Sequence, residues 1–88
     1  MNEELMLSAL ERAGAVARQL VKNGATLRGI SVHDGRPVIR IQRCGYSDRL
    51  IESGVAFYQN FGCGPSGPYK QGAFMVDGCK VVWSESLH

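Results

Sequence analysis

Two Asp-Gly dipeptides, Asp34-Gly35 and Asp77-Gly78, constrain the fold of this 88-residue chain more than any other feature. Each lies between two runs in which apolar and polar residues alternate. Asp-Gly in that setting favours a two-residue hairpin turn, because a type I′ turn needs positive φ at both central positions. We therefore expect one β-hairpin over residues 26–43 and a second over residues 72–83.

Counting outward from the first turn gives its register. Ile30 then pairs with Ile39, and Arg28 pairs with Ile41. A one-residue slip would turn every side chain to the other face, so a consistent apolar face supports this register. That face carries Ile30, Val32, Ile39 and Ile41.

The second hairpin gives a similarly consistent register. Its apolar face is expected to carry Phe74, Val76, Cys79, Val81 and Trp83. The expected pairs are Val76 with Cys79, Phe74 with Val81, and Gly72 with Trp83.

Residues 2–23 carry the periodicity of one amphipathic helix. Asn2 is suited to the N-cap position, and Asn23-Gly24 is a typical helix stop. The apolar stripe is expected to cover the sheet rather than to bind a partner. Gly14 weakens a helix, which indicates close packing at that point.

The middle of the chain gives weaker signals. Ser47 is expected to cap one short helical turn that ends at Glu52, and residues 55–61 are predicted to form a strand. Residues 62–72 are rich in Gly and Pro and are predicted to be a loop. The whole chain, 1–88, is expected to be one α+β domain, with the N-terminal helix packed on an antiparallel sheet of about four to five strands.

Composition excludes several classes of protein. Ten Lys or Arg against eight Asp or Glu give a net charge of +2, which is mild for a dedicated nucleic-acid binder. No apolar run approaches the roughly 20 residues that span a bilayer, so we expect no membrane partner. The odd cysteine count and the lack of an export signal favour reduced thiols and a cytoplasmic location.

No motif predicts a cofactor, a metal or a catalytic centre. Residues 62–67 spell GxGxxG, but the residues that follow do not open a helix, so we expect no bound nucleotide cofactor. A zinc site lacks closely spaced ligand pairs, and no nucleophile has a well-held general base, so we expect no metal and no enzymatic activity. The potential ligands considered are Cys44, Cys63, Cys79, His33 and His88.

An arginine–tyrosine set is the best candidate for a contact surface. The polar face of the first hairpin carries arginines, and tyrosines are expected in neighbouring segments. Such a set can be a plain solvated face, a protein-binding hot spot or a nucleic-acid surface that pairs with phosphates and stacks on bases. The candidate contact residues are Arg36, Arg40, Tyr58, Tyr69 and Lys70, with Arg28 and Arg43 at the margins.

Two short motifs carry a resemblance. Residues 35–41, GRPVIRI, and residues 78–83, GCKVVW, resemble small uncharacterised proteins of tailed phages and prophages of gammaproteobacteria. The resemblance covers roughly residues 24–84 and implies no catalytic residue. The resemblance implies the cytoplasm of a bacterial host as the location, and a role common among small phage proteins, the binding of a host enzyme, defence complex or transcription component.

The leading hypothesis is therefore a non-enzymatic phage or prophage accessory protein. It would bind and modulate a host macromolecule such as a nuclease or defence complex, with a host or phage protein as its partner. One alternative is a small nucleic-acid-binding module that uses the basic sheet face. Another is a self-assembling structural protein, such as a homodimer formed through an edge strand.

Overall fold

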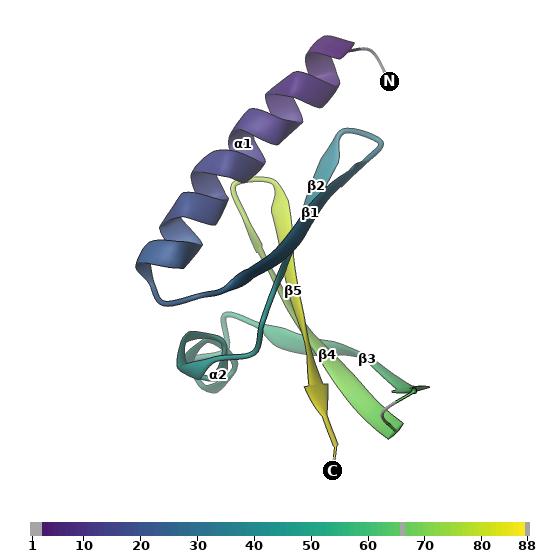
Figure 1. The fold of residues 1–88 in the computed structure, drawn as a ribbon. Coiled ribbons are helices and arrows are strands. Elements are labelled where there is room, and N and C mark those ends of the chain that lie inside the picture. The colour runs from purple at the N-terminus through teal and green to yellow at the C-terminus, as the bar shows by residue number, and fades with distance from the viewer. Residues whose placement is uncertain (1–2, 66, 88) are drawn as a thin grey trace.

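The computed structural model describes residues 3–65 and 67–87 and has the predicted α+β fold, with 33% helix and 46% strand. A long helix, α1, packs on a five-stranded sheet, and a short helix, α2, lies lower on the same side (Figure 1). The elements are α1 (Glu3–Lys22), β1 (Leu27–His33), β2 (Arg36–Ile41), α2 (Gly45–Glu52), β3 (Phe57–Gly64), β4 (Gly67–Val76) and β5 (Cys79–Ser86). The suggested N-cap, Asn2, lies outside the described residues.

The sheet has the strand order β1-β2-β5-β4-β3. Pairing is antiparallel within each hairpin, as predicted, but β2 pairs with β5 in parallel through Val38–Lys80, Ile39–Val81 and Arg40–Val82. The sheet is thus mixed rather than wholly antiparallel. The two hairpins are separated by α2 and β3, and the connection that brings β5 beside β2 leaves no short-range signal in the sequence.

The two Asp-Gly turns have the predicted conformation. Asp34 and Gly35 have φ of 52° and 75°, and Asp77 and Gly78 have φ of 48° and 76°. The three pairs expected in the second hairpin are all present. In the first hairpin Ile30 pairs with Ile39 as expected, but Leu27, not Arg28, pairs with Ile41, because a β-bulge shifts the register at Arg28.

The predicted loop at residues 62–72 is wrong. Most of it belongs to β3 and β4, which form a third hairpin in which Gly64 pairs with Gly67. Glycine there serves packing as well as turning: a Cβ on Gly72 would overlap the indole ring of Trp83. Pro65 lies in the turn and Pro68 lies near the start of β4, where a missing N–H donor is tolerated.

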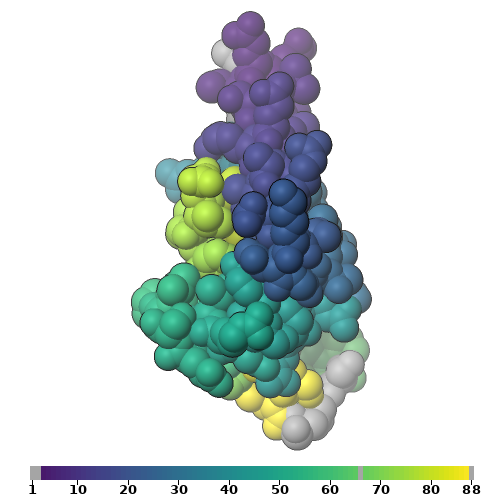
Figure 2. All heavy atoms as spheres, turned by 90° about the vertical axis from the view of Figure 1, so that its left-hand side faces the viewer, coloured from purple at the N-terminus to yellow at the C-terminus, as the bar shows by residue number. Residues whose placement is uncertain are grey.

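The core lies between α1 and the sheet. Small and branched side chains of the helix pack against the large apolar residues of β2, β4 and β5, while the N-terminal turns of α1 extend past the sheet (Figures 1 and 2). Gly14 does not mark a close approach, since nothing lies within 4 Å of an added Cβ. The main core residues are Ala13, Val16, Leu20, Ile39, Ile41, Phe74, Cys79, Val81 and Trp83.

Helix α2 begins three residues earlier than predicted. Cys44 is its N-cap, and Ser47 is the third helical residue rather than the cap. The buried Ser47 hydroxyl accepts a hydrogen bond from the Cys44 amide at 2.9 Å and donates one to the Cys44 carbonyl at 2.8 Å. Because this exchange satisfies backbone groups at the helix start, α2 is fixed at the point where the chain leaves β2.

Candidate functional site

Both helices found in residues 3–65 and 67–87 pack on one face of the sheet and leave the other face uncovered. Side chains alternate between the two faces of a strand, and the buried residues Ile39, Val81 and Phe74 assign one face to the helices. Their strand neighbours therefore define the opposite face, which we call the open face. Its residues include Arg36, Val38, Arg40, Phe57, Tyr69, Gln71, Ala73, Met75, Lys80, Val82 and Ser84.

Charge is segregated onto the open face. Arg36, Arg40 and Lys80 project from it, and Arg28 joins them at the β1 bulge. Among the described strand residues, no Asp or Glu lies on this face; Glu85, the one carboxylate in a strand, lies on the helix side. A net charge of +2 thus conceals a locally basic surface, and local fields of this kind govern the encounter with charged partners.

The β-bulge places Arg28 on the open face. Arg28 is the extra residue between Leu27, which pairs with Ile41, and Gly29, which pairs with Arg40. A bulge sets two residues opposite one and re-aims a side chain that regular pairing would turn the other way. Arg28 and Arg40 consequently line the same hollow.

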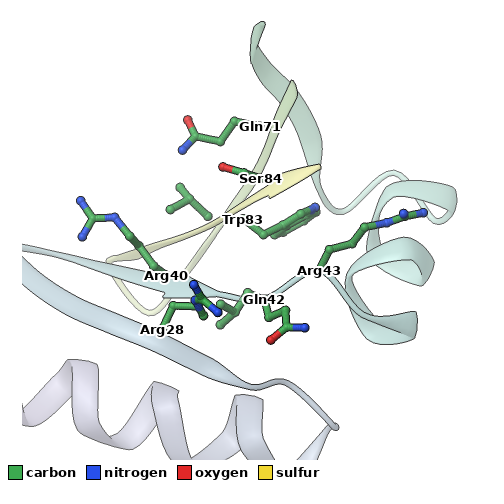
Figure 3. A pocket seen from close by; sticks show the side chains of 9 residues that line it. Arg28, Arg40, Gln42, Arg43, Gln71, Trp83 and Ser84 are labelled. Atoms are coloured by element: carbon green, nitrogen blue, oxygen red, sulfur yellow. The ribbon is translucent and has the colours of Figure 1, made fainter. Parts of the chain in front are cut away.

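That hollow, of about 390 Å³, lies where β2 and β5 separate (Figure 3). After Arg40 pairs with Val82, β2 turns away toward α2 while β5 continues beside β4. We call this place the fork. It is lined by Arg28, Arg40, Ile41, Gln42, Arg43, Gln71, Val82, Trp83 and Ser84.

The three arginines that line the fork differ in whether they have hydrogen-bond or ion-pair partners. Arg43 Nε lies 3.1 Å from Asp48 Oδ1 and 3.4 Å from Glu85 Oε1, and the hydrogen bond to Asp48 raises the pKa of Arg43. Within residues 3–65 and 67–87, neither Arg28 nor Arg40 has a hydrogen-bond or ion-pair partner. These two guanidinium groups are therefore available for an external anion.

A second hollow continues from the fork. It has a volume of about 350 Å³, is lined in part by Tyr69, and shares Gln71 and Ser84 with the fork. The Tyr69 ring lies against the bare backbone of Gly62: a Cβ there would lie 2.7 Å from the Tyr69 hydroxyl oxygen. Gly62 of the GxGxxG spelling thus makes room for an aromatic ring in a hairpin, and the described residues that follow form strands β4 and β5, not a helix.

The five predicted contact residues do not form one surface. Arg36, Arg40 and Tyr69 lie on the open face, whereas Tyr58 and Lys70 lie on the helix side. Lys70 Nζ is 3.9 Å from the centre of the Tyr58 ring, a cation–π contact. Lys70 lies in the segment predicted to be a loop, where no face can be assigned, and Tyr58 lies in a predicted strand whose neighbours in the sheet do not follow from the sequence.

Sequence reasoning missed a buried polar network beside the fork. Glu85 is 5% exposed, and its Oε2 accepts hydrogen bonds from Trp83 Nε1 at 2.9 Å and from the Tyr58 hydroxyl at 3.0 Å. The alternation of β5 could have placed Glu85 on the apolar face with Trp83. It could not have shown the tyrosine that joins from β3.

The cysteines are dispersed in the fold. Cys79 is buried in the core, Cys63 is exposed on β3 and Cys44 is half-buried at the start of α2. Among the described residues, no three His, Cys, Asp or Glu side chains come together in a way that could hold a metal ion. His88 lies outside the described residues. Neither described helix has the length and apolar character needed to cross a membrane.

The chain belongs to a family of uncharacterised proteins, whose model matches residues 1–86. No curated protein and no solved structure matches it.

Proposed function

We propose that this chain is a non-enzymatic binding protein whose open face contacts single-stranded nucleic acid. The observation that carries the proposal is the segregation of charge: Arg28, Arg36, Arg40 and Lys80 share one uncovered face that has no strand carboxylate among the described residues. Binding of a single strand needs a basic track together with aromatic rings, because every base has a face on which a ring can stack. Tyr69 and Phe57 supply rings on the same face.

From the sequence, a protein partner comes before nucleic acid because the net charge is mild, and the structure leads us to reverse that order. A net charge of +2 argues against nucleic acid only if the charges are evenly mixed, and here they are separated. The expected role as a phage or prophage accessory protein is compatible with a nucleic-acid partner.

A host protein is the second candidate partner. Phe57 and Met75 are 68% and 66% exposed on the open face. They are diagonal neighbours across β3 and β4, because Phe57 pairs with Ala73, two residues before Met75. Exposed apolar side chains beside arginines are also typical of protein-binding hot spots. In this alternative the protein modulates a host nuclease or defence complex through the same face.

Salt dependence of binding tests the nucleic-acid proposal. Four phosphate contacts by the open-face cations predict that log K falls with log salt at a slope of about −2.8, or about 50-fold between 50 and 200 mM salt. Fluorescence anisotropy of a labelled oligothymidylate measures this, with Arg36→Gln as the variant and Arg18→Gln on α1 as the matched control. No binding of the wild-type protein at 50 mM salt would refute the proposal.

A pull-down from a gammaproteobacterial lysate separates the two partners. A nucleic-acid partner predicts that nuclease treatment empties the eluate. A stoichiometric protein that survives nuclease, and that is lost in the Arg36→Gln variant, would favour the host-protein candidate instead. Light scattering of the free protein at high concentration tests the third hypothesis, since self-assembly through an edge strand would raise the molecular mass.

A further inference from the structure

We infer that the fork is a phosphate-binding subsite in which Arg28 and Arg40 together hold one phosphate group. The inference deepens the proposed function, because it assigns the nucleic-acid backbone a specific point of attachment. It also stands on its own chemistry, since a nucleotide or another phosphate ester presents the same group.

The first argument is that two arginines without partners line the same hollow. Arg28 and Arg40 come from adjacent strands and line one hollow of about 390 Å³. Neither has a partner in the described part of the chain, so both side chains are available to turn toward an anion in the hollow. Planar guanidinium groups match phosphate oxygens in bidentate geometry.

The second argument is that the hollow is selective for an anion. Gln42, Gln71 and Ser84 add amide and hydroxyl donors around it. The nearest carboxylates, Asp48 and Glu85, are already engaged by Arg43, and Glu85 is also held by Trp83 and Tyr58. Arg43, which also lines the hollow, thus pairs with both carboxylates, and no Asp or Glu is among the described lining residues.

The third argument is the backbone that builds the fork. The bulge at Arg28 brings that side chain beside Arg40 instead of beside Ile41. The hollow itself lies where the parallel pairing of β2 with β5 ends at Arg40–Val82, since β2 departs there while β5 continues to Ser86. This separation of the strands leaves side chains of both open to one space.

The fork also connects to an aromatic platform. Gln71 and Ser84 belong both to the fork and to the hollow that Tyr69 lines. Arg40 pairs with Val82 on β5, and Val82 pairs with Ala73 on β4, so Ala73 lies two strands away from Arg40. Tyr69 lies four residues further along β4, and strand spacing and rise then put the Cα atoms of Arg40 and Tyr69 about 16 Å apart. A strand of a few nucleotides can therefore place a phosphate in the fork and a base on Tyr69.

The experiment compares Arg28→Gln, Arg40→Gln and the double variant with Arg18→Gln, an exposed arginine on α1. In one arm, NMR follows the arginine Nε–Hε signals while inorganic phosphate is added to the full chain. In the other arm, anisotropy follows labelled oligothymidylate. We expect phosphate to shift Arg28 and Arg40 together. We also expect the double variant to lower the salt slope by about 1.4, with no change for Arg18→Gln.

The outcomes separate the two proposals. If oligothymidylate binds but the double variant behaves like Arg18→Gln, the fork is refuted and the open-face proposal stands. If oligothymidylate fails to bind while phosphate or a mononucleotide still shifts both arginines, the fork is supported with a small phosphate ester as its ligand. Uniform shifts of all arginine signals, with no binding of oligothymidylate, would overturn both.

Discussion

Replacement of Glu85 tests how much the buried polar network beside the fork stabilises the fold. This carboxylate is almost fully buried and accepts hydrogen bonds from Trp83 and Tyr58, while Arg43 lies 3.4 Å from its other oxygen. Glu85→Ala removes the shared acceptor of all three side chains. The variant should therefore destabilise the fold and loosen the connection between β5 and the segment that leads into α2.

The size of the effect depends on which donors can return to water. Trp83 is 2% exposed, so its indole N–H would be left buried without a partner, at a cost of about 1–3 kcal/mol. The half-buried Tyr58 hydroxyl regains water and adds less, about 1 kcal/mol. We expect Glu85→Ala to lower the free energy of unfolding by about 2–4 kcal/mol, out of about 4–13 kcal/mol for a chain of this length.

Urea denaturation followed by Trp83 fluorescence and by circular dichroism measures this loss. Glu85→Gln keeps an oxygen acceptor but no charge, so it should cost about half as much as Glu85→Ala. Glu52→Ala, an exposed position on α2, is the control and should change stability by less than about 0.5 kcal/mol. A Glu85→Ala protein as stable as this control would refute the argument from stranded donors.

Further predictions concern the glycines and the thiols. Gly72→Ala should lower stability by about 1–3 kcal/mol because its Cβ would overlap Trp83, whereas Gly14→Ala should raise it by about 0.5–1 kcal/mol; thermal melts compare the two. Burial raises the pKa of the Cys79 thiol, so a thiol reagent at pH 8 should modify exposed Cys63 first and Cys79 only after denaturation. Stability linked to protonated Cys79 should be complete below pH of about 8.5 and decline above it, and equal native-state reactivity of both thiols would contradict this.

What the sequence predicts well is local. Asp34-Gly35 and Asp77-Gly78 determine turns through backbone sterics alone, so both hairpins and the register of the second follow from them. The Arg28 bulge does not follow from regular counting, which gives every residue a partner; Gly29 beside it is the one sequence signal that could have marked it. Regular counting therefore paired Arg28 with Ile41.

The role of a glycine in this sheet depends on residues in other strands. Residues 62–72 read as a loop because glycine and proline usually break strands, yet Gly62 and Gly72 accommodate the rings of Tyr69 and Trp83. That role depends on a side chain in a neighbouring strand, and no pattern within the segment reveals it. The same error placed Lys70 on the predicted contact surface, since the face of a residue cannot be assigned in a loop.

The fork cannot be predicted residue by residue, because it depends on how distant strands pair. Arg40 was found by simple alternation, but the hollow beside it exists only because β2 pairs with β5 in parallel for three residue pairs and then departs. The chain must leave β2 to reach α2, so it cannot continue along β5. The topology that joins the two hairpins in one sheet therefore opens a gap at the carboxyl end of β2. The gap exposes two arginines and the polar edge of β5 to one space. In this fold, the pairing that joins the two hairpins and the hollow that we propose as a phosphate site have the same origin.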